Sequence, residues 1–538
     1  MTSRLAIPVG LALLALASAE GASGAFLGVS SPRAQWFENQ ASPSNPLAVN
    51  ESFGAALAAG DFNGDGAMDL ATGVPWDTGE SSAPVFDAGA VVIRWGVPDR
   101  GLATGPPDTV LSAYAAGSHL APADSKYFGV ALAAGDFNGD GRDDLAVGAP
   151  GSRPGPGFAF NWGAVIIHYG LPSGIQTAGE HFLMEGINGV PNPEDGVAYL
   201  GAALAAGDFD GDGYDDLAMG GSQKGGQEIG LVIVVHGHVG GLLPFVGYLV
   251  RQGLAGRPDS GEEFDHFGAA LASGNFDGDE RCTDVCRPLD DLAIAAPGED
   301  DEGAVMVVFG STNGVESSPS TYLRQATLGG SGGELGDQFG LALAAGDFNG
   351  DLADELVIGT PFEDLGAGID TGEVTVVAQL TAASHGPVLF LNQGGIFGNP
   401  AYNQTNDKLG KALAAADLDR DGADDLVIGL PGEAVGGVGR GGIVVLTGQP
   451  LGLYHLYGFL PPGTSGIPPA VPENLNAAGA ALAAGDFDGD GHPDLAIGLP
   501  GRYVGSSAFA GAEVVLYGAL FSDGFEGGST FSWSASAP

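Results

Sequence analysis

Basic residues are scarce in this chain of 538 residues. There are 18 Lys and Arg against 66 Asp and Glu, so the formal net charge is −48 at pH 7. A nucleic-acid partner is not expected, because phosphate binding needs a basic surface. The same charge argues against binding to anionic membrane surfaces. Such acidity is typical of a protein that stays soluble outside the cell.

Cysteine is almost absent. Only Cys282 and Cys286 occur, and both lie in one short segment. In a secreted protein we expect a local disulfide between them. A zinc site is the weaker alternative, because two cysteines alone provide too few ligands. Sequons at Asn50 and Asn403 would make the chain a glycoprotein only in an organism that glycosylates them.

Long apolar runs are missing after the first residues. Residues 1–19 are interpreted as a signal peptide, with Arg4 before an apolar stretch and Ala17-Ser-Ala19 as a small-x-small cleavage site. An uncleaved anchor is the alternative, although the stretch is short for a membrane span. No later segment suits a span, so none is expected in the mature chain. We therefore expect a secreted or cell-surface protein, extracellular or periplasmic.

Recognisable catalytic motifs are also absent. The sequence has no Gly-x-Ser-x-Gly elbow, no His-Glu-x-x-His pair and no phosphate-binding Gly-Lys-Ser/Thr. His236 and His238 have a metal-like spacing but are interpreted as two exposed imidazoles at a strand end. We therefore expect no enzymatic activity. A secreted hydrolase or lyase acting on carbohydrate or phosphoester is the alternative, because catalytic carboxylates can be assembled in space rather than in sequence.

The sequence does contain an internal repeat of about seventy residues. Each copy has an Ala- and Gly-rich segment, a nine-residue acidic loop, an apolar segment and a β-branched segment. No convincing helical period accompanies them. The seven loops start at Asp61, Asp136, Asp208, Asn275, Asp347, Asp417 and Asp486.

Seven units of this size predict an all-β fold, a seven-bladed β-propeller of four-stranded antiparallel blades. The Ala- and Gly-rich segments would form the innermost strands, where only small side chains leave room near the axis. A β-solenoid is the structural alternative, although its coils are usually much shorter.

The repeats also predict the domain limits. We expect the propeller to span residues 20–520, followed by a C-terminal tail at residues 521–538. Residues 34–40 resemble the outer-strand segment at residues 321–325, so an N-terminal strand is predicted to complete the last blade and close the ring. For the Ser-rich tail, a sorting signal and a frayed end are the alternatives.

The acidic loop has oxygen-bearing side chains at alternating positions. In the loop at Asp136 they occupy positions one, three, five and nine, and Gly141 at position six permits a sharp turn. Ligand sets of oxygen alone at this density suit Ca²⁺ better than zinc, copper or Mg²⁺. An EF-hand is excluded, because position twelve is Val147 and both flanks are predicted strands.

Six loops supply the predicted calcium ligands. The loop at Asp347 is degraded, with Leu352 in place of Gly, and the loop at Asn275 carries an insertion with both cysteines, so we expect weak or no binding in these two. The predicted ligands are Asp61, Asn63, Asp65, Asp69; Asp136, Asn138, Asp140, Asp144; Asp208, Asp210, Asp212, Asp216; Asp347, Asn349, Asp351, Glu355; Asp417, Asp419, Asp421, Asp425; Asp486, Asp488, Asp490 and Asp494.

A family resemblance follows from the segments around these loops. Phe-Gly pairs at Phe53, Phe128, Phe267 and Phe339 precede the loops, and Gly148-Ala149-Pro150 follows one of them. This pattern resembles the FG-GAP repeat of integrin α-subunit propellers, which is also similar to repeats beside the catalytic domain of a glycosylphosphatidylinositol-specific phospholipase D. The resemblance implies a seven-bladed propeller with structural Ca²⁺ in its hairpins. The departures from the pattern are Leu200, Leu409 and Ala478 in place of Phe, and Gly220-Gly-Ser222 and Ala295-Ala-Pro297 in place of Gly-Ala-Pro.

Four aromatic residues are candidates for a ligand-binding face. Trp76, Phe158, Phe160 and Trp162 lie in connections at the end of the blades opposite the acidic hairpins, and aromatic residues are favoured binding anchors. The alternative is that they cap the blade ends. We expect a monomeric binding or adhesion module with an extracellular protein or glycan ligand. A structural component of a surface or matrix is a further hypothesis.

Overall fold

A computed structural model describes most of the repeat region. All the described residues fall in one compact unit, Arg33–Pro538. The predicted signal peptide and C-terminal tail, together with Phe158 and Phe160, lie outside the described residues. The structure describes residues 34–38, 51–77, 88–102, 107–112, 126–153, 161–177, 181–187, 189–191, 199–222, 229–254, 257, 261–282, 286–315, 319–330, 333–366, 368–435, 438–439, 441–449, 455–460, 477–502 and 510–518.

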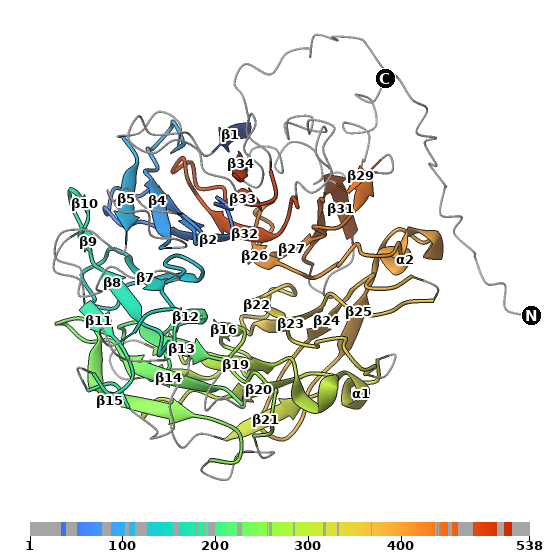
Figure 1. Ribbon diagram of the computed structural model, residues 1–538, viewed down its shortest axis with the longest axis horizontal. Helices are drawn as coiled ribbons and strands as arrows, with labels where there is room; N and C mark the ends of the chain where they lie inside the picture. The colour runs from blue at the N-terminus through green and yellow to red at the C-terminus, as the bar shows by residue number, and fades with distance from the viewer. Residues whose placement is uncertain are drawn as a thin grey trace, which may run out of the picture. The chain divides into compact units, whose positions relative to one another are not determined.

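Seven four-stranded antiparallel sheets make up the unit, which confirms the predicted seven-bladed β-propeller (Figure 1). In blades 1 to 3 the strands, from the axis outward, are β2 (Ala56–Gly60), β3 (Asp69–Val74), β4 (Ala90–Arg94) and β5 (Thr109–Ser112); β6 (Leu132–Gly135), β7 (Asp144–Gly148), β8 (Val165–His168) and β11 (His181–Leu183); β12 (Ala203–Gly207), β13 (Asp216–Gly221), β14 (Leu231–His236) and β15 (Leu243–Val250).

The remaining blades follow the same order. Blades 4 to 7 consist of β16 (Leu271–Gly274), β19 (Asp291–Ala296), β20 (Ala304–Val308) and β21 (Ser320–Leu323); β22 (Ala342–Gly346), β23 (Glu355–Thr360), β24 (Glu373–Val377) and β25 (Val388–Leu391); β26 (Leu413–Ala416), β27 (Asp425–Gly429), β30 (Ile443–Thr447) and β31 (His455–Leu460); β32 (Ala481–Gly485), β33 (Asp494–Leu499), β34 (Ala512–Leu516) and β1 (Ala34–Glu38).

Short elements decorate the connections between these strands. The two-stranded hairpins are β9 (Gly170–Leu171) with β10 (Gly174–Ile175), β17 (Glu280–Cys282) with β18 (Cys286–Pro288), and β28 (Ala434–Val435) with β29 (Val438–Gly439); the helical turns are η4 (Glu299–Asp301), α1 (Gln325–Leu328), α2 (Gln393–Ile396) and η5 (Pro400–Tyr402). No helix among the described residues is long and apolar enough to cross a membrane.

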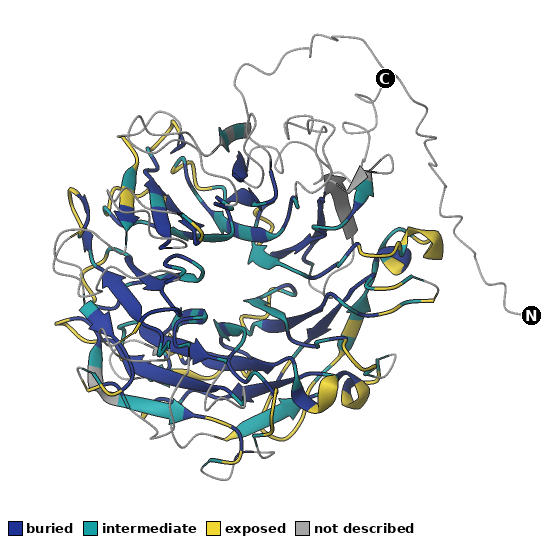
Figure 2. Cartoon of the chain, viewed as in Figure 1, coloured by how far each residue is buried: buried dark blue, intermediate teal, exposed yellow. Residues whose placement is uncertain are grey.

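The innermost strands meet around the axis. Each contacts the innermost strand of the next blade, and β32 contacts β2, so the contacts run through all seven blades and return to the first. The Leu-Ala-Ala-Gly type of sequence explains the close approach, because Ala and Gly leave space where strands converge. Burial increases from the innermost to the middle strands, which are almost entirely buried (Figure 2).

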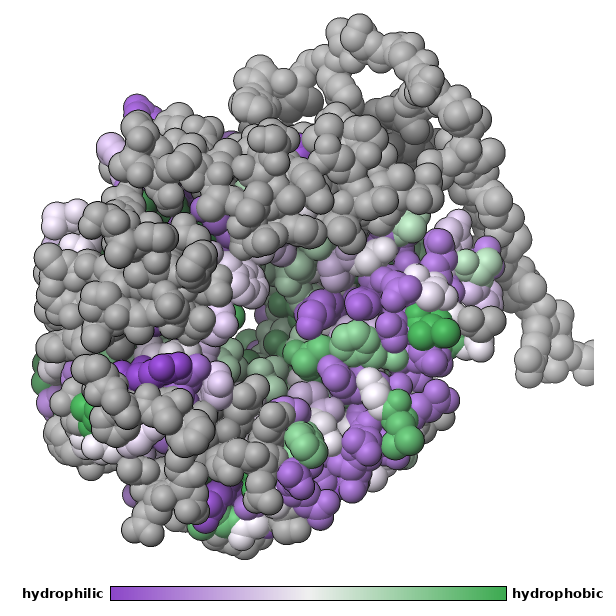
Figure 3. Space-filling model, viewed as in Figure 1, coloured by the Kyte–Doolittle hydropathy of each residue, from purple (hydrophilic) through white to green (hydrophobic). Residues whose placement is uncertain are grey.

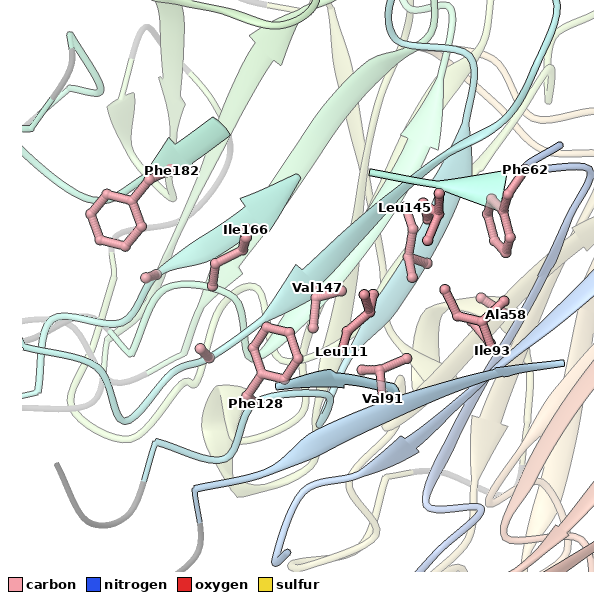
Figure 4. Close-up of a cluster of buried hydrophobic side chains, with 14 of the residues drawn as sticks. Ala58, Phe62, Val91, Ile93, Leu111, Phe128, Leu145, Val147, Ile166 and Phe182 are labelled. Carbon is pink, nitrogen blue, oxygen red and sulfur yellow. The ribbon is translucent and has the colours of Figure 1, made fainter. Parts of the chain in front are cut away.

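The core lies between neighbouring blades. At the interface of blades 1 and 2, Val91 and Ile93 of β4 pack toward Leu145 and Val147 of β7, with Phe128 between the two sheets (Figure 4). These middle strands are rich in β-branched residues, which suit a sheet buried on both faces. Similar clusters fill the other interfaces.

The last blade contains strands from both ends of the described chain. β1 pairs antiparallel with β34, and Ala34 lies opposite Leu516. Phe37 of β1 packs against the cluster that contains Leu70 and Phe487. That this strand closes the ring, as the sequence predicts, stays a prediction.

A buried ion pair lies at the interface of blades 7 and 1. Arg94 of β4 binds the carboxylate of Glu513 on β34, and Thr72 Oγ1 donates to Glu513 Oε2 at 2.6 Å. The side chain of Arg94 also lies over the Phe37 ring at 4.4 Å. Glu513 is fully buried, and its place is taken by Val91 in blade 1, so this pair is particular to the interface where the first and last blades meet.

We expect Arg94→Leu to lower the free energy of unfolding by about 3–5 kcal/mol, because it leaves the buried Glu513 carboxylate without its cation. Glu513→Val should cost less, because Arg94 keeps Asp108, whose Oδ2 lies 3.5 Å from Arg94 Nε. The double variant should lose much less stability than the sum of the two single variants, since both partners are then apolar. Urea denaturation of the three variants measures this difference. A double variant that loses as much as the sum of the single variants would contradict the role given to the pair.

Candidate metal centres in the acidic loops

The carboxylate at position one organises each hairpin loop. In blade 1, Asp61 Oδ1 accepts hydrogen bonds from the N–H groups of Gly64 and Asp65 at 2.7 and 3.1 Å, and Oδ2 accepts from Gly66 N at 2.9 Å. The first carboxylates of the loops at Asp136, Asp208, Asp347, Asp417 and Asp486 accept equivalent bonds. The loop is therefore wrapped around its first side chain.

The carboxylate at position nine ties the hairpin to the third strand of the blade. Asp69 accepts from Phe62 N at 3.1 Å and from Gly96 N, just after β4, at 2.8 Å. Glycine N–H groups after the third strands of blades 2, 3, 4, 6 and 7 donate in the same way. These aspartates are buried and begin the second strand, so their positions are fixed by the blade itself.

Burial makes these carboxylates hard to ionise without a cation. Burial, followed by the neighbouring Asp61 and Asp65, raises the pKa of Asp69 to about 8. The pKa of Asp144, Asp425 and Asp494 is raised to about 8 for the same main reason. A divalent ion would offset the desolvation and the mutual repulsion, so the loops are electrostatically suited to one.

Three loops bring three acidic side chains together. One ligand oxygen from each lies within 4.8 Å of the others in the groups Asp208, Asp210 and Asp212; Asp417, Asp419 and Asp421; and Asp486, Asp488 and Asp494. All nine residues belong to the predicted set. These clusters could hold a metal ion, and their donors are oxygen atoms throughout.

In the other three loops with predicted ligands, position three is an asparagine that contacts position nine. Asn138 Nδ2 donates to both oxygens of Asp144 at 3.2 and 3.1 Å. Asn63 stands 3.5 Å from Asp69, and Asn349 donates to Glu355. Positions three and nine therefore lie side by side, as a shared ion site requires. A rotation of the amide would turn its oxygen toward the same point.

The loop at Asp347 keeps the common backbone despite its sequence. Leu352, at the position of the usual glycine, has φ +73° and donates its N–H to Asp347 Oδ2 at 2.8 Å. A leucine in this left-handed region is strained. In the loop at Asn275 the insertion forms the β17–β18 hairpin, in which Cys282 pairs with Cys286 across the strands. The disulfide between them stays a prediction.

Sequence reasoning missed the residue at position eight. Asp143 Oδ2 accepts from Asp61 N of the preceding blade at 2.8 Å, and Asp143 N donates to the Asp61 carbonyl at 3.1 Å. We call this reciprocal pair of bonds a clasp. The clasp aspartates, each bound to the first residue of the preceding loop, are Asp143, Asp215, Asp290, Asp354 and Asp424.

The clasp explains the glycine before each of the five loops that have a clasp. A Cβ on Gly135 would lie 2.8 Å from Asp215 Oδ2, and the same crowding occurs at Gly207 and Gly274. In blade 6 the preceding residue is Ala416, and there position eight of the next blade is Pro493. Proline has neither the N–H nor the carboxylate of a clasp. The acidic doublet at positions eight and nine, which is Asp-Asp in four of these loops and Asp354-Glu355 in the fifth, was the available signal.

The interpretation of His236 as an exposed imidazole is wrong. His236 is buried, and its Nδ1 lies 3.0 Å from Asp216 Oδ2 and 3.4 Å from Asp210 Oδ2. The imidazole therefore contacts position nine and position three of the third loop. His238, two residues later, is exposed as expected.

The aromatic candidates separate into different environments. Trp76 is 38 % exposed, at the end of its blade. Trp162 is half-buried and packs against the core between blades 1 and 2. The two described tryptophans therefore differ in exposure, and their role in ligand binding or in capping stays a prediction.

Comparison with known proteins identifies the repeat. The FG-GAP repeat family matches residues 53–93, 128–160, 200–235, 339–377 and 478–512. The chain thus has FG-GAP repeats in five places, which fall in blades 1, 2, 3, 5 and 7. The repeat predicted from the Phe-Gly and Gly-Ala-Pro segments is confirmed.

Two groups of relatives are similar to the chain. A phosphatidylinositol-glycan-specific phospholipase D of Rattus norvegicus is 29% identical over 397 residues, which is 70% of this chain and 43% of the relative. Integrin alpha-5 of Xenopus laevis is 30% identical over 247 residues, 44% of this chain and 20% of the relative. Integrin alpha-V of Gallus gallus is 31% identical over 212 residues, 37% of this chain and 17% of the relative. The chain spans less than half the length of each.

These relatives correct one expectation. The sequence predicts no enzymatic activity, but the phospholipase D relatives from rat, mouse and cattle are named as enzymes. The expectation rested on the lack of short catalytic motifs. It is contradicted, because similarity to a named enzyme extends over most of the repeat region.

We expect Asp215→Ala to lower the free energy of unfolding by about 1–3 kcal/mol, because the partly buried N–H of Asp136 loses its acceptor. Gly135→Ala should also destabilise, since its Cβ would crowd the Asp215 carboxylate. In the double variant the crowding is relieved, so the losses should not add. Chemical denaturation of the four proteins gives the coupling, and strictly additive losses would contradict the clasp.

Proposed function

Because the chain has FG-GAP repeats and is homologous to part of the integrin alpha chains, we propose that it is a secreted or cell-surface binding module. Calcium in the acidic hairpins holds the blades in a fixed arrangement. The opposite end of the blades carries the ligand. The observation that supports this best is the difference between the two ends of the blades, with acidic hairpins at one end and exposed apolar residues at the other.

The carboxylates at the hairpin end can coordinate an ion. Carboxylates at positions one and nine already have backbone partners, and the acids at positions three and five converge on position one in the loops at Asp208 and Asp417. Calcium is the proposed ion, because it accepts six to eight oxygen ligands with flexible geometry. Bound calcium would neutralise carboxylates that burial otherwise keeps protonated.

Calcium should raise the melting temperature, and excess chelator should lower it. A ligand bound only by the folded state stabilises it by about 2.7 kcal/mol per site at a hundredfold excess over the dissociation constant. The shift should shrink at low pH, because protons compete for the same carboxylates. Thermal unfolding with calcium, with magnesium and with chelator measures the effect; identical curves would contradict the assignment.

The opposite end carries exposed apolar residues beside acids. Phe264, Leu335 and Ile369 are 53, 80 and 58 % exposed. Each stands in a connection at that end, and Gly336 N, next to Leu335, donates to the Asp301 carbonyl at 2.7 Å. The surface over α1 and α2 in Figure 3 is mostly hydrophilic with separate hydrophobic residues. Exposed acids around them include Asp300, Asp301, Glu334 and Asp364.

This pattern favours a protein ligand with basic groups around apolar anchors. Apolar residues at the centre of a contact provide most of its affinity, and complementary charge guides the encounter. The proposed ligand is therefore a cationic extracellular protein rather than an acidic one.

Leu335→Ser and Ile369→Ser should each lower the affinity for the ligand at least about tenfold, which corresponds to a loss of about 1.4 kcal/mol of binding free energy. Val239→Ser, at the hairpin end and 68 % exposed, is the matched control and should leave binding unchanged. A protein and glycan array with calcium identifies the ligand, and surface plasmon resonance compares the variants. If Val239→Ser lowered the affinity as much as the other two variants, the proposed binding face at the opposite end would be refuted.

A second candidate is phosphoester hydrolysis. It is supported by the names of the phosphatidylinositol-glycan-specific phospholipase D relatives. The direct assay is release of a glycosylphosphatidylinositol-anchored reporter from vesicles, compared with heat-denatured protein. Release above that background would favour this candidate, and binding without release would favour the first.

A further inference from the structure

Blade 5 has polar side chains where the other six blades have apolar ones. At the end of its second strand, Thr360 pairs with Glu373 across β23 and β24. At the matching pair every other blade has only Gly, Ala, Val or Leu, for example Val74 with Ala90 in blade 1. Thr375, two residues beyond Glu373, replaces Val, Ile or Met of the other blades.

These three side chains share one buried face. Thr360 and Glu373 are directly opposite, and Glu373 and Thr375 alternate onto the same side of β24. Thr360 and Thr375 are completely buried, and within the described part of the chain their Oγ1 atoms have no hydrogen-bond partner. Buried hydroxyls without partners destabilise a fold. A bound group that accepts or supplies contacts to these hydroxyls would remove that cost.

A second carboxylate meets Glu373 at the interface of blades 4 and 5. Gln325 Nε2, from the end of blade 4, lies 2.9 Å from Glu363 Oε2 and 3.2 Å from Glu373 Oε1. Asn392 Nδ2 approaches the other oxygen of Glu373 at 3.4 Å. Glu363 and Glu373 are 1 and 4 % exposed. Burial, and then Glu363, raise the pKa of Glu373 to about 7.

In blade 4 the corresponding negative charge is neutralised by an arginine. Its glutamate, Glu299, matches Glu363 and binds Arg324 Nη2 at 2.8 Å. Arg324 precedes helix α1, and the residue that precedes α2 in blade 5 is Asn392. Glu373 takes the place of Ala304. Compared with the site around Glu299 in blade 4, the site around Glu363 between blades 4 and 5 therefore has one positive charge fewer and one negative charge more.

We propose that a calcium ion binds between blades 4 and 5, held by the carboxylates of Glu363 and Glu373. Thr360 and Thr375 supply hydroxyl oxygens on the same face, and rotation of the Gln325 amide supplies its oxygen. The double positive charge of the ion compensates for the lost positive charge of Arg324 and for the added negative charge of Glu373. The site lies at the opposite end of the strands from the acidic hairpins, and it is independent of the proposed binding function.

The variant Thr360→Val/Glu373→Ala/Thr375→Val gives blade 5 residue types that other blades have at these positions. It should bind one calcium ion fewer per chain than the wild type, as counted by native mass spectrometry of the full chain. In chelator it should melt above the wild type, because an uncompensated buried charge is gone, and calcium should narrow or reverse this difference. Glu299→Gln, at the neutralised site of blade 4, is the matched control and should keep the full count.

An unchanged calcium count in the triple variant would overturn the proposal. So would a melting difference that is the same in calcium and in chelator, because the two carboxylates would then simply share a proton. If the triple variant does not fold, Glu363→Gln keeps the side-chain size and removes one charge. A count reduced by one in this variant supports the site, and an unchanged count refutes it.

Discussion

The arrangement depends on a buried carboxylate at the start of the second strand of each blade. Asp69 and its counterparts accept one hydrogen bond from the hairpin and, in most blades, a second from the end of the third strand. A single side chain thus fixes the hairpin against the sheet. The same burial makes its negative charge unfavourable, which raises its pKa and favours a nearby cation. Folding of the blade and suitability for metal therefore have one physical origin.

The two ends of a blade differ because the strands are antiparallel. Hairpins between first and second strands gather at one end, where side chains are committed to internal bonds. The connections at the other end, such as those with Phe264 and Leu335, leave large side chains in solvent. A scaffold whose geometry is fixed at one end can vary its connections at the other without loss of the fold. This separation allows relatives with different names to share the repeat.

Much of the fold could be predicted from sequence, because the signals are local and repeated. Small residues predicted the inner strands, β-branched runs the middle strands, and the loop spacing brought together Asp208, Asp210 and Asp212 as expected. The acidic doublet at positions eight and nine repeats too, but it does not reveal its partner in the clasp, which is 77 to 82 residues away and belongs to another blade. The burial of His236 likewise depends on how a bulged strand meets the third loop.

Pro493 has a consequence for how the ring comes apart. Five interfaces have a complete clasp, and the interface of blades 7 and 1 keeps the bond from Met68 N to the Asp486 carbonyl at 2.8 Å. Between blades 6 and 7, proline provides neither bond. There β26 and β32 pack together, Gly442 N donates to the Ala478 carbonyl at 3.1 Å, and Arg420 Nη1 lies 3.3 Å from His492 Nε2. Closed rings fail where cohesion is lowest. Because this interface, among those that the structure describes, lacks both bonds of the clasp, we expect blades 6 and 7 to separate first under mechanical load or local melting.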